Sequence, residues 1–270
     1  MNFFLNKKVG ILGLSRTGTS SIKFLKKKGF DIFGWDDNKK IFLKEKRKLS
    51  IQKLDKNNLK KMDLMIVSPG INSFGKNKHL FLKKAEKEKV ETINDVELFF
   101  RFNPEEKFIG VTGTNGKSTT VSLLNHLLKK LKINSLLGGN IGNPVFNLKK
   151  TKNSVVTLEI SSFQLELIKR LRFNIAVLLN ISKDHIERHG TFNRYISEKT
   201  KIFNNQTKND FAIIGIDDNI TFNLAKKLKK KLDSKVITIS GENKKADIYV
   251  KNQRLIINLV LKKKKIYKEI

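Results

Sequence analysis

The sequence predicts an α/β protein with two domains, each built around a largely parallel β-sheet. At 270 residues the chain is long for a single domain, and hydrophobic residues make up 39% of it, which is enough for two cores. Apolar runs bounded by Gly, Asn or Asp alternate with longer, Lys-rich periodic segments. This alternation is typical of strand–helix units around a parallel sheet.

The first domain is expected to span residues 1–97. Its last element should be a short strand, because the sequence becomes turn-like soon afterwards. The predicted elements, in chain order, are a strand over residues 8–14, a helix over 17–28, a strand in DIFGW, a strand over 63–71 that Pro69 and Gly70 break, a helix in HLFLKKAEKEK and a strand in VETI.

The second domain is expected to span residues 98–270, with the boundary near the turn proline of FFRFNPEEK. Its tail, from residue 246 onwards, alternates like one or two antiparallel edge strands. The predicted strands are FIGVTG, SVVTLEI, NIAVLLNIS, DFAIIGID and KVITIS, and the predicted helices begin at Lys117 or run through FQLELIKRL, YISEKTKIF and LAKKLKKKL.

Composition excludes several kinds of site. The chain has no cysteine, so it has no disulfide, thiolate metal site or cysteine nucleophile. A formal net charge of +31 would suit nucleic acid, because clustered Lys and Arg release counterions from phosphate backbones. Most of this charge is lysine spread over every predicted helix, however, and no recognition motif accompanies it. We interpret the lysines as solvated helix faces and expect no nucleic-acid partner.

The amino terminus, MNFFLNKKVGILGLSRTG, passes from a short apolar patch straight into glycine-rich sequence, unlike a signal peptide. No segment approaches the ~20 uninterrupted apolar residues that a membrane-spanning helix needs. We therefore expect a soluble, cytoplasmic protein without a membrane partner.

The stretch FIGVTGTNGKSTT places a predicted strand before a glycine-rich turn and a helix. Gly113 and Gly116 permit backbone conformations in which successive N–H groups point at one anion, and the helix start adds its dipole. Lys117 can reach the β- and γ-phosphates of a nucleotide, and the Ser118 hydroxyl suits Mg²⁺. The general phosphate-loop pattern has glycine where this chain has Val111, and the alternative is an ordinary glycine turn. We expect a P-loop mononucleotide-binding domain.

Two other predicted strand ends carry polar side chains, and such ends face the ligand crevice in open parallel sheets. Glu159 ends SVVTLEI and offers hard oxygen ligands for Mg²⁺ beside ATP, with a plain surface glutamate as an equal alternative. Asp184 and His185 follow NIAVLLNIS. A histidine there can bind a metal or a substrate, although an isolated loop histidine usually does neither.

The first domain opens with GLSRTGTS, in which Gly13, Ser15 and Gly18 stand where a dinucleotide-binding fold has three glycines. Asp36 follows the second strand, within reach of a ribose hydroxyl. We expect a Rossmann-like domain that binds a nucleotide or a nucleotide-sugar diphosphate at a helix terminus. The alternative is a bare strand–helix turn.

Together these motifs resemble the Mur ligases of peptidoglycan synthesis, in that family's order, from about residue 7 to the carboxyl terminus. GTNGKST and DH are shared with folylpolyglutamate synthases. SSFQLE, joined to GGNIG and a dinucleotide-like first domain, is similar to the branch that adds D-glutamate. The matching segments are GLSRTGTS, SPGI, VTGTNGKSTT, GGNIGNP, LEISSFQLE, LNISKDH and YISEKTKIF.

The resemblance implies a set of site residues. Lys199 matches a lysine that is carbamylated in the family, which would turn a cation into an oxygen-donating anion able to bind or orient Mg²⁺. With Lys117 and His185 it makes up the implied catalytic set. Ser118 and Glu159 would bind one Mg²⁺ and His185 a second. The ATP phosphates would contact Gly113, Thr114, Asn115, Gly116, Lys117, Ser118 and Thr119. The UDP-sugar would contact Arg16, Thr17, Asp36, Asp37, Ser68, Gly70 and Asn140, with Ser161 and Gln164 along its muramoyl-alanine part.

The implied reaction is ATP-driven amide formation by a monomer that uses Mg²⁺. The alanine carboxylate of UDP-N-acetylmuramoyl-L-alanine would attack the γ-phosphate and give an acyl phosphate. The amine of D-glutamate would then displace phosphate. Lys117 and the metals would neutralise charge on the transferred phosphoryl group.

The resemblance also implies a third, C-terminal domain that binds D-glutamate and closes over ATP, and a His–Asn segment that contacts adenine. The chain ends at KKKKIYKEI, about where these parts should begin. The central domain is therefore expected to be incomplete at its C-terminal end, as a fragment or a natural truncation. The alternatives are a module that binds UDP-sugar or ATP without turnover, and another Mur ligase or a folylpolyglutamate synthase.

Overall fold

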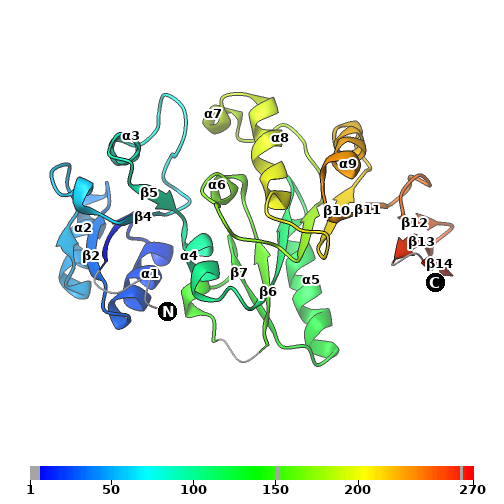
Figure 1. Ribbon diagram of the computed structural model, residues 1–270, viewed down its shortest axis with the longest axis horizontal. Coiled ribbons are helices and arrows are strands. Elements are labelled where there is room, and N and C mark those ends of the chain that lie inside the picture. Colours follow the sequence, from blue (N-terminus) through cyan, green and yellow to red (C-terminus); the bar gives the residue numbers. More distant parts are fainter. Residues whose placement is uncertain (1–6, 150–152, 262–263) are drawn as a thin grey trace.

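The computed structural model describes residues 7–149, 153–261 and 264–270, and it confirms an α/β fold with two parallel sheets (Figure 1). Residues 1–6, which entered the signal-peptide argument, lie outside the described residues. Within the described ranges, no helix combines the length and the apolar character needed to cross a bilayer.

The N-terminal sheet has the strand order β3-β2-β1-β4-β5, and every pairing in it is parallel. Apolar clusters lie on both of its faces, as expected for a sheet made of strand–helix units. Its elements are β1 (Lys8–Leu12), α1 (Arg16–Lys27), β2 (Asp31–Trp35), α2 (Lys39–Leu49), β3 (Gln52–Lys53), η2 (Leu59–Lys61), β4 (Leu64–Val67), α3 (Leu80–Lys87) and β5 (Glu91–Ile93).

The second sheet has the order β14-β13-β12-β11-β10-β9-β6-β8-β7, and only the two pairings at its C-terminal edge, β12 with β13 and β13 with β14, are antiparallel. Antiparallel edge strands in the tail are thus confirmed, although three strands form where one or two were predicted. Residues 262–263 of this tail are not described. The strands are β6 (Lys107–Thr112), β7 (Ser135–Gly139), β8 (Val155–Glu159), β9 (Ile175–Leu178), β10 (Phe211–Gly215), β11 (Lys235–Ser240), β12 (Ile248–Lys251), β13 (Arg254–Leu261) and β14 (Lys264–Glu269).

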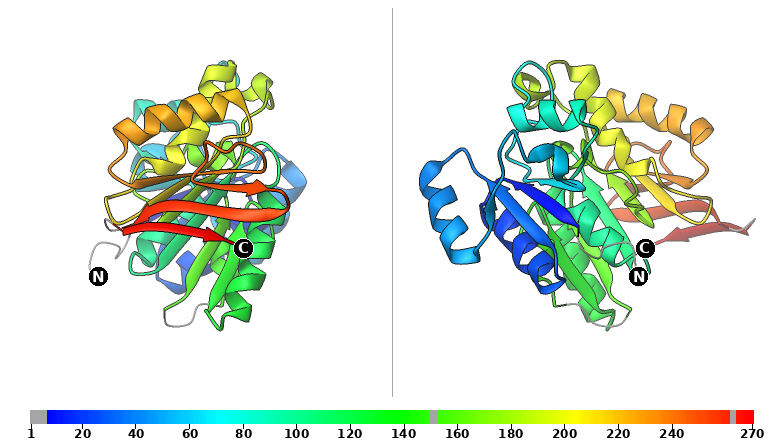
Figure 2. Two further views of the ribbon diagram at one scale, coloured as in Figure 1. Left: turned by 90° about the vertical axis from the view of Figure 1, so that its right-hand side faces the viewer. Right: turned by 60° about the vertical axis from the view of Figure 1, so that its left-hand side comes forward.

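The helices of this second unit cover the two faces of its sheet unequally (Figure 2). A large apolar cluster includes residues of α6, α8 and α9, whereas the cluster beneath α5 is built around only Val111, Val121 and Val177. The helices are α5 (Lys117–Lys130), η3 (Val145–Asn147), α6 (Ser162–Leu165), α7 (Ile186–His189), α8 (Phe192–Thr200), η4 (Lys201–Phe203) and α9 (Asn219–Lys231).

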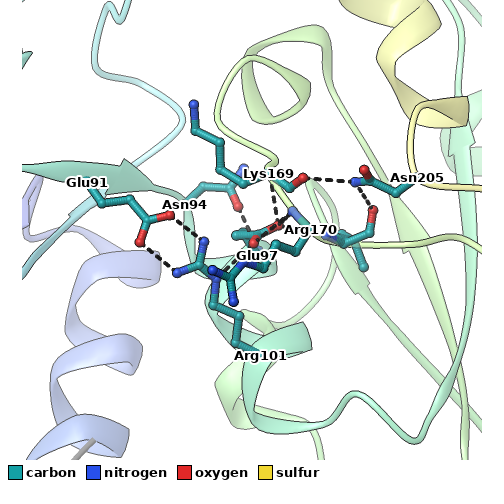
Figure 3. Close-up of polar contacts among 8 residues, drawn as sticks. Glu91, Asn94, Glu97, Arg101, Lys169, Arg170 and Asn205 are labelled. Atoms are coloured by element: carbon teal, nitrogen blue, oxygen red, sulfur yellow. Dashed lines mark hydrogen bonds and ion pairs between the residues drawn. The ribbon is translucent and has the colours of Figure 1, made fainter. Parts of the chain in front are cut away.

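Helix α4 (Asp95–Phe102) joins the two units and contributes to both cores. Leu98 belongs to the N-terminal core, while Val96 and Phe99 belong to the core of the second unit. The fully buried Glu97 carboxylate accepts hydrogen bonds from the backbone N–H groups of residues 169–171, at 2.9–3.0 Å, and from Arg101 Nε at 2.9 Å (Figure 3). Arg101 in turn bonds Glu91 of β5. An ionic network therefore connects β5, α4 and the loop after α6.

The structure differs from the predicted elements in length and number. The helix expected through FQLELIKRL shortens to α6, because the N–H groups of residues 169–171 turn toward Glu97 instead of continuing the helix. The strand expected over residues 63–71 is only β4. Helices α2, α4 and α7 and strands β3 and β7 were not predicted.

Candidate functional site

The glycine-rich turn lies between β6 and α5, as predicted. Gly116 is the residue before the helix and has φ of +83°, which strains any side-chain-bearing residue and explains a glycine there. The helix starts with Lys117, so its free N–H groups face the turn. Ser118 and Thr119 occupy its first turn, on the exposed side.

Asn180, just beyond β9, holds the turn in shape, although the sequence argument did not single it out. Its side-chain oxygen accepts hydrogen bonds from the backbone N–H groups of Thr114, at 3.1 Å, and Asn115, at 2.9 Å. Its amide donates back to the Asn115 carbonyl at 3.1 Å. Tyr195 of α8 contacts the Thr114 hydroxyl at 3.1 Å. In the sequence, Asn180 lies near the end of the predicted strand NIAVLLNIS and within the segment LNISKDH that resembles the Mur ligases.

Two lysines donate to one carbonyl oxygen of the turn. Lys117 Nζ lies 3.0 Å from Gly113 O and 2.7 Å from Thr114 O, and Lys199 Nζ from α8 lies 2.7 Å from the same Gly113 oxygen. Lys199 is only 2% exposed. Burial, and then repulsion by the Lys117 charge, lower the pKa of Lys199 to about 7. A large fraction of its amine is therefore neutral near neutral pH.

Glu159 lies at the carboxyl end of β8 and is buried. One carboxylate oxygen accepts from Ser118 Oγ at 2.6 Å and the other from Asn140 Nδ2 at 2.8 Å. Gly139, before Asn140, has φ of +99°, and a Cβ there would lie 2.2 Å from Glu159 O. A buried carboxylate beside a hydroxyl fits Mg²⁺, which takes one or two carboxylates and completes its shell with water and phosphate oxygens.

His185 is not brought to this pair by any contact that the structure shows. It precedes α7 with φ of +51°, is about half exposed, and lies 3.5 Å from Asp184 and 3.7 Å from Glu187. In the described part of the chain, no three His, Asp or Glu side chains gather as a preformed metal cluster. Ser118 and Glu159 are thus the only two predicted metal ligands found in contact among the described residues.

Ser161 and Gln164 form a capping box at the start of α6. The Gln164 side-chain oxygen accepts from the Ser161 N–H at 3.0 Å and hydroxyl at 3.1 Å, and its backbone carbonyl accepts from Asn94 at 2.7 Å. Gln164 is 1% exposed. Its side chain is therefore committed to the helix start in this conformation.

The glycine turn of the N-terminal sheet has the expected close approach. A Cβ on Gly18 would lie 1.9 Å from the Gly13 carbonyl oxygen, so α1 can start against β1 only with glycine there. Asp36 accepts from the Leu14 N–H at 2.7 Å, and Ser68 donates to Gly13 O at 3.0 Å. These two predicted UDP-sugar contacts thus help to shape the turn.

The remaining predicted UDP-sugar contacts surround the same turn. Arg16 and Thr17 are in the first turn of α1, and the Arg16 guanidinium donates to Gly142 O of the second unit at 3.4 Å. Asp37 accepts from Trp35 and contacts His79 at 3.1 Å, and bonds from these two neighbours outweigh desolvation and lower its pKa. Gly70 is exposed in the loop after β4.

Each unit has a cavity next to its glycine turn. One of about 300 Å³ lies beside α1, and one of about 470 Å³ lies beside the Gly113–Ser118 turn. The first is lined by residues that include Ser15, Arg16, Lys23, Lys44 and Lys48, and the second by residues that include Asn115, Gly116, Thr120, Asn180 and Asp217. Four cationic side chains and one carboxylate, Glu45, line the first cavity, so its charge is positive overall and suits an anionic ligand.

Comparison with known proteins agrees with this geometry. Residues 111–268 match the model of the Mur ligase middle domain, and residues 7–94 match that of the Mur ligase MurD-like N-terminal domain. The chain is 37% identical to the UDP-N-acetylmuramoylalanine–D-glutamate ligase of Clostridioides difficile, over 94% of this chain and 57% of that protein. It is also 37% identical to the ligase of the same name from Rickettsia prowazekii, over 89% of this chain and 53% of that protein. The chain thus spans about half the length of these relatives.

Solved structures show the same fold. A murein peptide ligase from Psychrobacter arcticus superposes with a TM-score of 0.55 at 16% identity, covering 91% of this chain and 56% of that one. The UDP-N-acetylmuramate–alanine ligase of Thermotoga maritima gives 0.51 at 22% identity, with 98% and 60% covered. Because the middle-domain match alone covers residues 111–268 of 270, the chain belongs to the Mur ligase family.

Proposed function

We propose that this chain provides the sugar-nucleotide and ATP sites of a cytoplasmic ligase that adds D-glutamate to UDP-N-acetylmuramoyl-L-alanine during peptidoglycan synthesis. One observation carries the proposal: Ser118 of the phosphate loop meets Glu159 of the adjacent strand end at 2.6 Å, beside the two lysines on Gly113 O. The names of the relatives that are 37% identical support this choice of substrate.

In the ATP site, residues Gly113–Thr119 would surround the phosphates with backbone N–H groups. Lys117 would exchange two carbonyl oxygens for phosphate oxygens and oppose the charge that develops during phosphoryl transfer. Magnesium bound by Ser118 and Glu159 would supply further charge neutralisation, and His185 is our candidate for a second ion.

Lys199 is the proposed site of carbamylation. Its lowered pKa of about 7 leaves a neutral amine with a free electron pair. Attack of this Nζ on the carbon of CO₂ forms one N–C bond and releases one proton, which gives a carbamate anion. That anion would no longer be repelled by Lys117 and would offer oxygen atoms toward the metal site.

In the sugar-nucleotide site, the turn at Gly13 and the start of α1 would hold the diphosphate, with Arg16 as a cation. Asn140 would contact the UDP-sugar from the second unit, and Ser161 and Gln164 would lie along its muramoyl-alanine part. Binding at Gln164 would require its side chain to leave the capping box. We propose a monomer without a nucleic-acid or membrane partner.

Equilibrium titration with ADP–Mg²⁺ and with UDP-N-acetylmuramoyl-L-alanine tests the two sites. We expect Lys117→Ala to weaken ADP–Mg²⁺ binding at least about tenfold, because it removes a charged phosphate contact. Lys129→Ala, at the exposed far end of the same helix, is the matched control. Wild-type protein that binds neither ligand would show the proposal to be wrong.

Release of phosphate that depends on D-glutamate, but not on L-glutamate, tests turnover. A module that binds both nucleotides without turnover is the second candidate, because the chain aligns with only 53–57% of these relatives' length. Tight binding of both ligands with no phosphate release would favour that module. Release driven by another amino acid would favour a different Mur ligase or a folylpolyglutamate synthase.

A further inference from the structure

The loop between β4 and α3, in the N-terminal unit, reaches across to α6 and α7 of the second unit (Figure 1). This loop begins with Ser68 and contains Gly70, both predicted to contact the UDP-sugar. Of the two helices that it meets, α6 follows the strand end at Glu159, and α7 begins directly after His185. Contacts between them therefore join the two halves of the proposed sugar-nucleotide site.

Arg188 of α7 makes the central contact. One guanidinium nitrogen donates to Pro69 O at 3.0 Å and the other to Ile71 O at 2.8 Å, so one planar group holds both ends of a short turn. The same guanidinium lies 3.6 Å from the centroid of the Phe163 ring in α6. Two parallel donors and a flat stacking face are properties that lysine does not share.

A second contact between the same segments is buried. Glu166 contacts Ser73 of the loop with one carboxylate oxygen and lies 3.3 Å from His189 Nδ1 with the other. His189 Nε2 lies 2.9 Å from the hydroxyl of Ser162, at the start of α6. The side chains of Glu166 and His189 are 5% and 0% exposed. The loop is therefore attached to α6 and α7 at two points, one of them out of water.

We propose that Arg188 is a positioning residue for the sugar nucleotide, which it does not itself need to touch. By fixing the Pro69–Ile71 turn on α7, it sets the separation between the UDP half of the site, in the N-terminal unit, and the sugar–alanine half, in the second unit. Only a ligand long enough to contact both halves depends on that separation. The proposal rests on the proposed function, because it takes UDP-N-acetylmuramoyl-L-alanine as that ligand.

Binding of three ligands to Arg188→Ala, Arg188→Lys and wild-type protein tests the proposal. We expect Arg188→Ala to weaken binding of UDP-N-acetylmuramoyl-L-alanine about tenfold or more, as loss of two charge-assisted hydrogen bonds implies. UDP alone and ADP–Mg²⁺, which each need one unit, should bind within about twofold of wild type. Arg188→Lys should weaken binding of UDP-N-acetylmuramoyl-L-alanine less than Arg188→Ala does, but its affinity should stay below that of wild type. Arg254→Ala, which removes an arginine that is 69% exposed, is the control and should change nothing.

Hydrogen exchange without ligand gives an independent readout. Amides of residues 70–75 should exchange about tenfold faster in Arg188→Ala than in Arg254→Ala, while those of β1 stay unchanged. Unchanged sugar-nucleotide affinity, equal weakening for UDP alone, or unchanged exchange would each overturn the positioning role. A wild-type protein that does not bind the sugar nucleotide would instead refute the proposed function, and the positioning role with it.

Discussion

At the scale of single residues, the site depends on groups whose chemistry the fold changes. Lys199 is a surface-type side chain by its sequence context, YISEKTKIF, yet it is buried against the Gly113 carbonyl. Gly18 is a small residue whose missing Cβ makes room for a backbone oxygen.

Lys199 should titrate far below the other lysines. In NMR spectra of protein labelled at lysine Cε and kept free of CO₂, so that Lys199 is not carbamylated, we expect one signal with a midpoint near pH 7, which disappears in Lys199→Arg. The amine is charged below that midpoint and neutral above it. In the unfolded chain, Lys199 keeps its proton up to about pH 10.5. Between about pH 7 and 10.5 the unfolded state therefore binds one more proton than the folded state, and the free energy of unfolding rises with pH. A midpoint above 9 would contradict the burial argument.

Gly18→Ala should disrupt the N-terminal unit. The new Cβ would lie 1.9 Å from the Gly13 carbonyl oxygen. This oxygen belongs to the backbone, so it cannot rotate away as the end of a flexible side chain can. We expect a loss of about 3 kcal/mol or more in the free energy of unfolding, measured by urea titration. Gly70→Ala has open space around its Cβ and is the control in the same unit. Equal stability of the two variants would show that α1 can shift.

At the scale of elements, the sequence predicted the buried strands and both glycine turns, because their signals are local. Periodicity and flanking glycines mark β1, β6 and β8 regardless of their partners. The length of α6 was predicted wrongly, since Glu97, more than 70 residues away, takes the N–H groups that would extend it. Asn180 and Arg188 were missed for a similar reason: their partners are set by tertiary contacts and not by a motif.

Glu97→Gln should destabilise the junction at α4. The carboxylate faces only donors, three backbone N–H groups and Arg101, so an amide nitrogen would meet them with its own hydrogens. We expect a loss of roughly 2–4 kcal/mol in urea-induced unfolding. Glu88→Gln changes an exposed carboxylate in the neighbouring helix end and should cost little. A similar small effect for Glu97 would mean that the loop can rearrange around it.

At the scale of the whole molecule, two glycine turns lie in two separate sheets, each with its own cavity. Nucleotide binding should therefore be divided between the units. We expect ADP–Mg²⁺ to slow hydrogen exchange at residues 113–118 and leave 13–18 unchanged, and UDP to do the reverse. Mass spectrometry of peptides from both turns measures this, with the ligand-free protein as reference. Protection of one turn by both ligands would refute two independent sites.

Helix α4 has a consequence for how this architecture can be taken apart. Because its two sides fill different cores, a cut between residues 97 and 98, the boundary that the sequence suggested, would leave each fragment with half of a helix that both require. A chimera that exchanges one unit with that of another ligase would have to include α4 in the exchanged part. The core surface of the remaining unit that packed against α4 would then have to be redesigned. Recombination between such genes should thus favour crossovers before residue 95 or after residue 102, where the breakpoint spares the shared helix.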